Sequence, residues 1–563
     1  MFSAHNVVFE NTVLSKSFSL PKKIRWHCTM AKCHAAGLPP ALKNAALALG
    51  ITKGKKDTGK DLIEKYSLLD RKTGEFNPIP HDDMLEWLAY CKQDINTAMA
   101  VDNRIPNTLD RAGRLMATLD MNLRGMPIDV DLAQRVVDTL VKQKELAADE
   151  LPINTNSTKQ MLSYCSAYGV SLPNVTIQTV DLALRANDLP KPVRDILLAR
   201  QSGSKTSTKK YTTMLALANR GRIQEGFQYH GAHTGRDSGR GVQPQNLPRG
   251  TLEDSVMLEY IDDADMVALY GKTPSEIAKG GLRSIIRSSK GLICSDFAEI
   301  ETRVLFWLAN DKHLEMIKSG LDLYIKMAAD IYAIEYNQVT RAQRAVGKAA
   351  VLGLGFGMGS GFDKDGAALQ DAKGAYRGFK GLITAQGLDV PDSMIKKAVA
   401  LYRGNFIGVT GLWDKFDMAY RKAMRGEITR VRGCTFKKLG KYYMSITLPS
   451  GRRNLYFYPS IEDSDQITYL SGKSPLSKAA RDEAHVAYSG ISMYKKKLYG
   501  GRIVQNVVQS VARDVLFDAF DRLTDAGYEL IGRFHDELLA EKCSDSQCLD
   551  EFNQIMKIVP DWA

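Results

Sequence analysis

Two short apolar segments, far apart in the chain, each lead directly to acidic residues. Gly291-Leu292-Ile293-Cys294 precedes Asp296, and YELIGRF (528–534) precedes Asp536 and Glu537. Short apolar runs of this kind are typical of strands that emerge from a core. The second segment continues as ELLAE (537–541), so the sequence predicts two strands that meet at a turn. The fold class we expect is α+β, in which late strands return beside early ones.

The chemistry of the two aspartates depends on whether the fold brings them together. A lone carboxylate at the end of a strand is usually a helix cap or a surface residue. Asp296 and Asp536 are 240 positions apart, so their sequence alone does not establish a meeting. If they do meet, they could hold two Mg²⁺ ions, which prefer oxygen ligands and share them with substrate phosphates. Such a pair could activate a hydroxyl for in-line displacement of pyrophosphate.

A more specific pattern is the basic stripe in RAQRAVGKAAVLGLGFGMG (341–359). Arg344, Lys348, Leu352 and Phe356 recur every four residues, so they share one face if the helix continues. Cations at one end and apolar groups at the other suit a nucleotide, although such residues can also be simply solvated. The glycines from 353 to 359 follow the predicted helix, whereas a dinucleotide fingerprint opens one, so that motif is excluded.

Composition favours a polyanionic partner and a reducing compartment. Lys and Arg number 76 against 64 Asp and Glu, and the net charge is +12. Basic proteins bind polyanions because each cation near a phosphate releases counterions. The eight cysteines form no CxxC pair, and no secretory signal or apolar run of about 20 residues is present. We therefore expect a cytoplasmic protein without membrane association, in a bacterial cell or in the cytoplasm of a host.

Helical and extended patterns alternate along the chain. An amphipathic helix is predicted over 84–105, and a long helical stretch follows over 107–150. Residues 311–430 have mostly helical patterns, 437–459 predict a hairpin with a Pro-Ser-Gly turn, and 502–523 predict another helix.

Three segments, in order, resemble motifs of the family A (DNA polymerase I type) DNA polymerases. SDFAEIETR (295–303) resembles the first palm motif, RAVGKAAVLGLGFG (344–357) the fingers motif, and FHDE (534–537) the last palm motif. TGRDSGRGVQPQNLP (234–248), GGRIVQNVVQSVARDVL (500–516) and the phage-like LPSGRRNLYFYP (448–459) are similar to further segments of the family. The resemblance implies a right-hand polymerase fold preceded by a partial ribonuclease H-like domain. Its expected domains are a partial 3′–5′ exonuclease-like domain over residues 1–105, a thumb over 106–225, the first palm segment over 226–310, fingers over 311–430 and the second palm segment over 431–563.

The resemblance also implies roles for individual residues. The metal ligands would be Asp296 and Asp536, with Mg²⁺ as the ion at both positions and Mn²⁺ as a possible substitute. Glu301 would be the steric gate against a ribose 2′-hydroxyl, Lys348 a proton donor to pyrophosphate, and Glu537 a catalytic neighbour of the metal site. The nucleotide would be bound by Arg344, Lys348, Leu352, Phe356, Glu301 and Tyr324. Primer and template would be bound by Arg236, Gln245, Asn246, Gln505, Gln509, His535 and Arg303. Leu352, Phe356 and Tyr324 depart from residues that are frequent in the family.

The N-terminal hundred residues resemble only a portion of the family's exonuclease. AHNVVFE (4–10), with Asn6 and Glu10, resembles its second motif, and Tyr90 with Asp94 resembles its third. The family's first Asp-x-Glu motif lies upstream of the second, where this sequence has three residues, and Glu10 replaces the more usual aspartate. We expect proofreading to be lost or incomplete in this chain.

The predicted function is template-directed extension of a primer 3′ end with dNTPs, in the replication of a phage genome. The partners would be primer-template DNA and dNTPs, bound by a monomer; a processivity factor or a separate exonuclease subunit remains open. A single-subunit RNA polymerase would share the palm, but Glu301 and the exonuclease remnants argue against it. The alternative from another class is a non-catalytic DNA-binding protein on a decayed polymerase scaffold.

Overall fold

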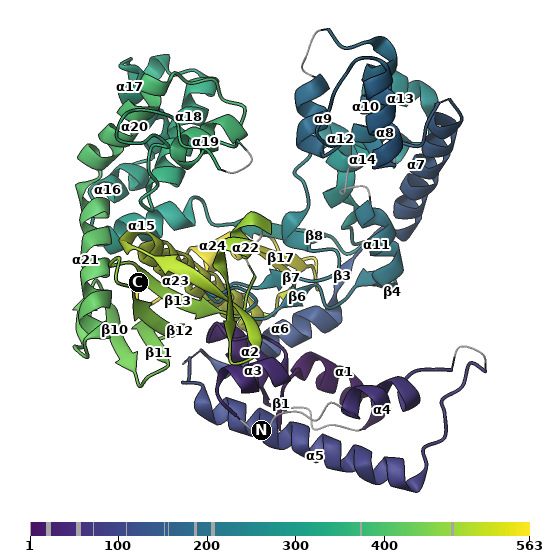
Figure 1. Cartoon of the computed structure of the whole chain (residues 1–563), viewed down its shortest axis with the longest axis vertical. Helices are drawn as coiled ribbons and strands as arrows, with labels where there is room; N and C mark the ends of the chain where they lie inside the picture. The colour runs from purple at the N-terminus through teal and green to yellow at the C-terminus, as the bar shows by residue number, and fades with distance from the viewer. Residues whose placement is uncertain are drawn as a thin grey trace.

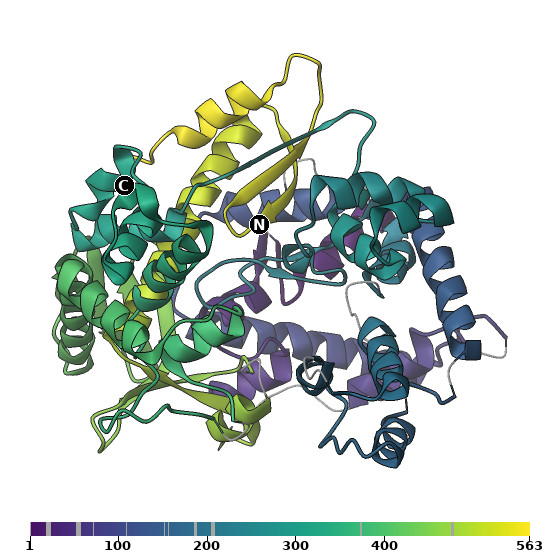
Figure 2. The ribbon, with the colours of Figure 1, turned by 90° about the horizontal axis from the view of Figure 1, so that it is seen from above.

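The computed structural model describes residues 2–563 except 19–23, 52–57, 71–72, 109, 151, 156, 185–187, 204–208, 372–373 and 475–477. Two helical lobes rise on either side of a central group of strands, and the N-terminal helices lie below them (Figure 1). From above, the two lobes lie on opposite sides of the molecule (Figure 2). Within the described residues, no helix combines the length and the apolar character needed to cross a bilayer.

Three antiparallel strands form the floor between the lobes, and we call them the floor sheet. Their order is β16-β17-β8, with bounds β8 Leu292–Asp296, β16 Glu529–Phe534 and β17 Glu537–Glu541. β17 lies in the middle, and its Glu537 pairs with Asp296 while its Glu541 pairs with Leu292. Buried residues of this sheet pack on α6 (Ala112–Arg124), α23 (Gly500–Asp525) and α24 (Leu549–Lys557). The predicted return of the late strands beside the early one is confirmed.

A second, seven-stranded antiparallel sheet connects the N-terminal segment (residues 2–104) to the helical lobe on the left of Figure 1 (residues 300–424), which we call the left lobe. Its order is β14-β15-β13-β12-β11-β10-β9, with bounds β9 Thr429–Val431, β10 Cys434–Leu439, β11 Tyr443–Thr447, β12 Arg453–Ile461, β13 Ile467–Ser471, β14 His485–Tyr488 and β15 Ile491–Leu498. Successive side chains of a strand point to opposite faces. On β12, Tyr456 therefore packs with the left lobe, while Leu455 and Phe457 pack on the N-terminal helices. Burial on both faces explains the apolar run over residues 455–459 of this strand.

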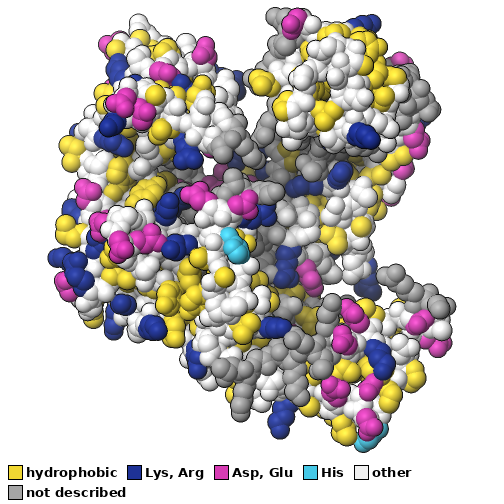
Figure 3. Space-filling model, in the orientation of Figure 1, with side chains coloured by type: hydrophobic (Ala, Val, Ile, Leu, Met, Phe, Trp, Pro, Cys, Tyr) yellow, Lys and Arg dark blue, Asp and Glu magenta, His cyan; other side chains and the backbone are white. Residues whose placement is uncertain are grey.

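The lobes are built from helices that each bury one apolar face. The left lobe consists of α15 Ile300–Ala309, α16 His313–Lys318, α17 Leu323–Tyr332, α18 Arg341–Leu354, α19 Gly378–Ala385, α20 Asp392–Asn405 and α21 Ile407–Met424. The right lobe consists of α7 Val130–Glu150, α8 Thr158–Ala167, α9 Ile177–Leu184, α10 Lys191–Gly203, α11 Lys209–Leu217, α12 Leu252–Met257, α13 Ala264–Tyr270 and α14 Pro274–Gly280. In the space-filling view the surface is hollowed between them (Figure 3).

The remaining elements are short or lie near the N-terminus. The N-terminal segment contains β1 Phe2–Ala4, α1 Val7–Ser17, β2 Trp26–Cys28, α2 Thr29–Ala35, α3 Leu42–Ala48, α4 Thr58–Tyr66 and α5 His81–Arg104. Short pieces elsewhere are β3 Met126–Pro127, β4 Ala218–Asn219, β5 Arg222–Ile223, β6 Phe227–Gln228, β7 Ser238–Gly239 and α22 Lys478–Ala484.

Two expectations about the organisation differ from the structure. The helical stretch predicted over 107–150 is divided into α6 and α7, because Gly125 leaves the helix at φ +66° and Pro127 follows in an extended strand. In addition, one buried core combines α7 and α11 with α12 and α14, so it crosses the expected boundary at residues 225 and 226. The five domain limits therefore stay predictions, and the structure favours counting residues 252–285 with the right lobe.

Candidate active site between the lobes

The two aspartates meet at the end of the floor sheet that faces the hollow. Asp296 is the last residue of β8 and pairs with Glu537 in the strand register. Asp536 lies in the two-residue turn between β16 and β17, and its carbonyl accepts a hydrogen bond of 3.0 Å from the backbone N–H of Phe297. The sheet register therefore brings together two residues that are 240 positions apart, which is the condition for their shared chemistry.

The environment of this pair is electrostatically unfavourable for two bare carboxylates. The pKa of Asp536 is raised, first by burial and also by the negative charge of Asp296. The side chain of Asp296 is exposed, while that of Asp536 is half-buried. His535, in the same turn, has φ 54°, a conformation that is uncommon for a residue other than glycine. Close carboxylates that repel each other are the kind of oxygen donors that divalent cations bind.

Glu301 is held by an arginine from the loop between β6 and β7. Nη2 of Arg236 donates a 2.6 Å hydrogen bond to Oε1 of Glu301, and both side chains are partly exposed. The positive charge of Arg236 also acts to lower the pKa of Asp536, which places all three groups in one electrostatic neighbourhood. The expected steric gate and an expected DNA-binding residue are thus direct partners.

The basic residues of α18 gather around Tyr324 of α17. The guanidinium of Arg344 lies 5.3 Å and Nζ of Lys348 lies 5.7 Å from the centre of the Tyr324 ring. Arg344 also donates from Nε to the Asp322 carboxylate at 2.7 Å. Burial raises the pKa of the Tyr324 hydroxyl, and the nearby Glu299 raises it further. The three residues expected to bind a triphosphate therefore form one group, in which Tyr324 contributes a ring and a hydroxyl.

A pocket of about 460 Å³ adjoins this basic group. Its lining includes Lys348, Leu352, Phe356 and Gln505, all of which the sequence motifs assign to nucleotide or DNA. The expectation that Phe356 continues the helical stripe is wrong, because α18 ends at Leu354. Phe356 nevertheless reaches the same pocket from the glycine-rich segment beyond the helix.

The other expected DNA-binding residues are distributed around the floor and α23. Gln505 and Gln509 are half-buried and lie one turn apart on α23, and Gln505 accepts a 2.9 Å hydrogen bond from Arg502. The side chain of Asn246 donates to Gln243 at 3.1 Å, and that of Arg303 donates to the carbonyl of Ala298 at 2.9 Å. His535 is exposed beside Asp536. The amide atoms of Gln245 are buried and have no hydrogen-bond partner among the described residues.

The exonuclease-like residues lie in the N-terminal segment. Asn6 directly precedes α1, and Glu10 lies on that helix, where burial raises the pKa of its carboxyl. Tyr90 and Asp94 lie one turn apart on α5, and Tyr90 is buried. Across the described residues, no group of three or more His, Cys, Asp or Glu side chains could hold a metal ion. The assignment of these residues to a nuclease stays a prediction.

Several site residues had no signal in the sequence. Tyr499, Arg502 and Gln386 line the pocket, and Asp322 holds Arg344. Cys294 lies on the strand face beside Glu537, and burial together with a hydrogen bond to Glu537 raises the pKa of its thiol to about 12. The sequence could have suggested Asp322 as a helix cap, because aspartate is favoured directly before a helix. In the structure it precedes α17 and accepts hydrogen bonds from two backbone N–H groups of the first turn.

Comparison with known proteins finds similarity to one family of enzymes. The sequence profile of DNA polymerase family A matches residues 116–365, a range that contains Asp296, Glu301 and the α18 motif. The DNA polymerase of Bacillus phage SP02 is 29% identical over an alignment that covers 100% of this chain and 86% of that protein. The chain is therefore similar to DNA polymerase family A over this range and to the phage enzyme over its whole length. It is accordingly a DNA-directed DNA polymerase, and polymerases of this family generally depend on divalent metal ions.

Other relatives agree over shorter stretches. DNA polymerase I of Chloroflexus aurantiacus is 26% identical over 42% of this chain, and that of Bacillus subtilis is 27% identical over 42%. These matches span about a quarter of each relative (25% and 26%). Among solved structures, the polymerase domain of Pol1 from M. smegmatis, in complex with DNA primer-template and dNTP, has a TM-score of 0.59 at 17% identity. The match covers 98% of this chain and 81% of that domain. This likeness confirms the right-hand polymerase fold.

Proposed function

We propose that the polymerase extends a primer 3′ end with dNTPs at the site formed by Asp296, Asp536 and α18. The observation that carries the proposal is the convergence of the two aspartates at one end of the floor sheet. Phage DNA replication is the biological task that we propose, because the phage SP02 relative matches over the whole chain. The protein would act as a monomer on primer-template DNA.

Asp296 and Asp536 are the residues that would hold two Mg²⁺ ions. Their fit rests on their donor chemistry, because both offer carboxylate oxygens. It rests also on their proximity, since the negative charge of Asp296 adds to burial in raising the pKa of Asp536. Bound divalent ions would supply charge stabilisation for the attacking hydroxyl and for the leaving pyrophosphate. Two aspartates do not complete two coordination shells, so substrate phosphates and water would provide further ligands.

The residues of the left lobe would bind and orient the incoming nucleotide. Arg344, Lys348 and the Tyr324 hydroxyl form the cationic, hydrogen-bonding group that suits a triphosphate. The adjoining pocket, with Leu352 and Phe356, offers apolar surface for the flat base. Lys348 borders both regions, so it could donate a proton to pyrophosphate as it leaves.

The floor and α23 would hold the duplex at its growing end. Arg236 and the amide side chains of Gln505 and Gln509 can donate to minor-groove acceptors, which every base pair presents. Glu301 accepts a hydrogen bond from Arg236. It would exclude an incoming nucleotide that carries a ribose 2′-hydroxyl.

Primer extension with Mg²⁺ and all four dNTPs tests the proposal. The wild-type protein should extend a primed template, and Asp536→Asn and Asp296→Asn should each lose at least about a hundredfold in rate, because a neutral amide is a poor ligand for a divalent cation. Asp545→Asn, at an exposed loop position, is the matched control and should extend normally. Extension by Asp536→Asn at the wild-type rate would contradict the metal assignment. A wild-type protein that binds primer-template without extending it would favour the decayed-scaffold alternative.

A further inference from the structure

The loop that carries Arg236 is fixed on both sides by three buried arginines from three different elements. Nη2 of Arg452, which precedes β12, donates to the carbonyl of Thr234 at 3.0 Å. Nε of Arg513 on α23 donates to the carbonyl of Gly235 at 3.1 Å. Nε of Arg533 on β16 donates to the carboxylate of Asp237 at 2.9 Å. The residues directly before and directly after Arg236 are therefore held by charged donors from within the protein.

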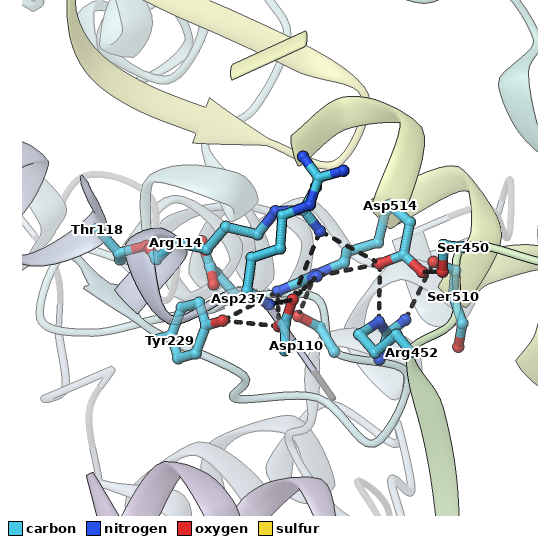
Figure 4. A network of polar contacts seen from close by, with 12 residues as sticks. Asp110, Arg114, Thr118, Tyr229, Asp237, Ser450, Arg452, Ser510 and Asp514 are labelled. Atoms are coloured by element: carbon cyan, nitrogen blue, oxygen red, sulfur yellow. Dashed lines mark hydrogen bonds and ion pairs between the residues drawn. The ribbon is translucent and has the colours of Figure 1, made fainter. Parts of the chain in front are cut away.

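The arginines are themselves held by a buried network of polar contacts (Figure 4) and by an aromatic ring. Asp514 accepts from Nε of Arg452 at 2.7 Å and from Nη1 of Arg513 at 3.0 Å. Arg533 and Arg513 both stack on Phe517, with guanidinium carbons 3.7 Å and 3.5 Å from the ring centre. The side chains of the three arginines are at most 2% exposed. Each guanidinium fork thus binds a carboxylate or ring and the loop at the same time, which a lysine could not do.

The close approach of the network explains the residue beside Arg236. Gly235 has φ +91°, and a Cβ atom there would lie 2.6 Å from Nη1 of the buried Arg452. A side chain at this position would displace the arginine from Thr234. The loop therefore reaches its conformation only with glycine next to Arg236.

Arg236 itself extends from this rigid base toward the site. It is 17% exposed and donates through Nη2 to Glu301. Its Nε is buried and has no hydrogen-bond partner within the described residues. Burying charged groups is costly, and buried polar networks persist where they fix one conformation. Here the conformation that they fix is that of the loop below Arg236.

We propose that Arg452, Arg513 and Arg533 are positioning residues that hold Arg236 and its partner Glu301 at the primer end. The proposal rests on the proposed function, in which Arg236 contacts the minor groove of the terminal base pair. The three arginines do not touch the substrate and act through the backbone of residues 234 and 235 and through Asp237. They would therefore govern how strongly the enzyme distinguishes a matched from a mismatched primer terminus, because a loosened arginine tests the shape of that pair less sharply.

A double-mutant cycle separates positioning from mere stabilisation. Arg533→Lys keeps the positive charge and loses the fork, and Arg236→Ala removes the group that it is proposed to position. Folding is checked by thermal melting, and the rates of extension from matched and mismatched primers are then measured. Each single variant should lose about tenfold or more in extension from the matched terminus, and the ratio of matched to mismatched extension should fall. In the Arg236→Ala background, Arg533→Lys should have almost no further effect.

A network residue that does not touch the loop provides the control. Arg114 is also buried, at 5% exposed, and donates from Nε to Asp521 at 3.2 Å. Its other carboxylate partners are Asp110, Asp518 and, at 4.0 Å, Asp514, and none of them belongs to the loop. Arg114→Lys should lower the melting temperature and leave the primer-terminus ratio unchanged. If Arg533→Lys does not fold, Arg452→Lys takes its place in the same cycle.

The outcomes are distinguishable from a failure of the proposed function. Independent effects of Arg533→Lys and Arg236→Ala, or a terminus ratio that moves equally in Arg114→Lys, would overturn the positioning role. An unchanged ratio of matched to mismatched extension in Arg236→Ala would also overturn the positioning role. If Asp536→Asn is inactive in the same assay, the assignment of the metal ligands would still stand. Absence of extension by the wild-type protein would instead remove the proposed function itself.

Discussion

Removing the carboxylate of Asp110 should destabilise the protein far more than removing a comparable carboxylate on the surface. Asp110 is 8% exposed and lies between the N-terminal segment and α6. It accepts from Nη2 of Arg513 at 2.7 Å and from Nη1 at 3.2 Å, and from the Tyr229 hydroxyl at 2.6 Å. Asp110→Ala leaves a buried guanidinium without one of its two counter-charges and a buried hydroxyl without its acceptor.

The expected loss can be worked out from these contacts. Breaking a buried ion pair by removing one partner costs about 3–5 kcal/mol. Asp514 still contacts Arg513, which favours the lower end, whereas the unsatisfied Tyr229 hydroxyl adds a penalty of about 1–3 kcal/mol. Because the two terms are not additive, we expect a total of about 3–5 kcal/mol. Asp262→Ala is the control, since Asp262 pairs with Arg135 at 2.6 Å but is 50% exposed, and its loss should stay below about 1 kcal/mol.

The pH dependence of this difference has a defined sign. Burial alone would raise the pKa of Asp110, but the attraction of Arg513 and Arg452 outweighs burial and holds the pKa below its ordinary value of 3.8. A carboxylate with a lowered pKa contributes stability that is present above its ordinary pKa and is lost as the pH falls below it. The difference in the free energy of unfolding between wild type and Asp110→Ala should therefore be largest at pH 7 and should become smaller in acid.

Thermal denaturation of the three proteins at about pH 7 and at about pH 4 and below measures both effects. A loss of about 3–5 kcal/mol corresponds to a fall in melting temperature of about 6–20 °C for a unit of about 150–250 residues. Equal melting temperatures for Asp110→Ala and Asp262→Ala would refute the idea that the network is tightly coupled. A difference in melting temperature between wild type and Asp110→Ala that became larger in acid would refute the expected direction of the pH dependence.

Three further results are expected. Lys348→Met should raise the KM for dNTPs and slow single-turnover incorporation by about tenfold or more, because a cation beside the triphosphate is lost, and unchanged kinetics would contradict its role. His233 is half-buried, with its Nε2 2.7 Å from the carbonyl of Leu455, and its pKa is lowered from 6.5 to about 3, chiefly by loss of solvent around the ring. It should therefore make folding less stable as the pH falls between these two values. His233→Gln should weaken that acid sensitivity in melting curves. A primer with a mismatched 3′ end should not be trimmed with Mg²⁺, and rapid trimming would show an active exonuclease.

The two candidate metal ligands could be predicted because each of them has a signal in its own short segment of the sequence. Asp296 and Asp536 each follow an apolar strand, and the strand register that joins them is dictated by which faces must be buried. The basic stripe of Arg344 and Lys348 was likewise visible in four-residue spacing within one helix. The shared face depended on the helix continuing to Phe356, and that condition is not met, because α18 ends at Leu354.

The supporting network could not be predicted, because none of its contacts to the loop is local. The residues that meet in it are separated by hundreds of positions: Arg513 and Asp110 by 403, Arg533 and Asp237 by 296, and Arg452 and Thr234 by 218. A buried arginine in a sequence has the same appearance as a solvated one, since charge and helical spacing do not report burial. The sequence therefore predicts that cations are numerous enough to bind a polyanion, but not which of them are already engaged within the protein.

This distinction changes how a motif of the family should be interpreted. TGRD (234–237) and GRR (451–453) resemble segments that line the polymerase site, and their charged residues look equivalent in sequence. The structure separates them, because the side chain of Arg236 is 17% exposed, whereas that of Asp237 is 3% exposed and that of Arg452 is 2% exposed, with partners inside the protein. Substitution of Arg236 should thus change recognition of the primer terminus with little loss of stability, while substitution of Asp237 or Arg452 should change both. Burial, rather than membership of a motif, decides whether a charged side chain contacts the substrate or positions the residue that does.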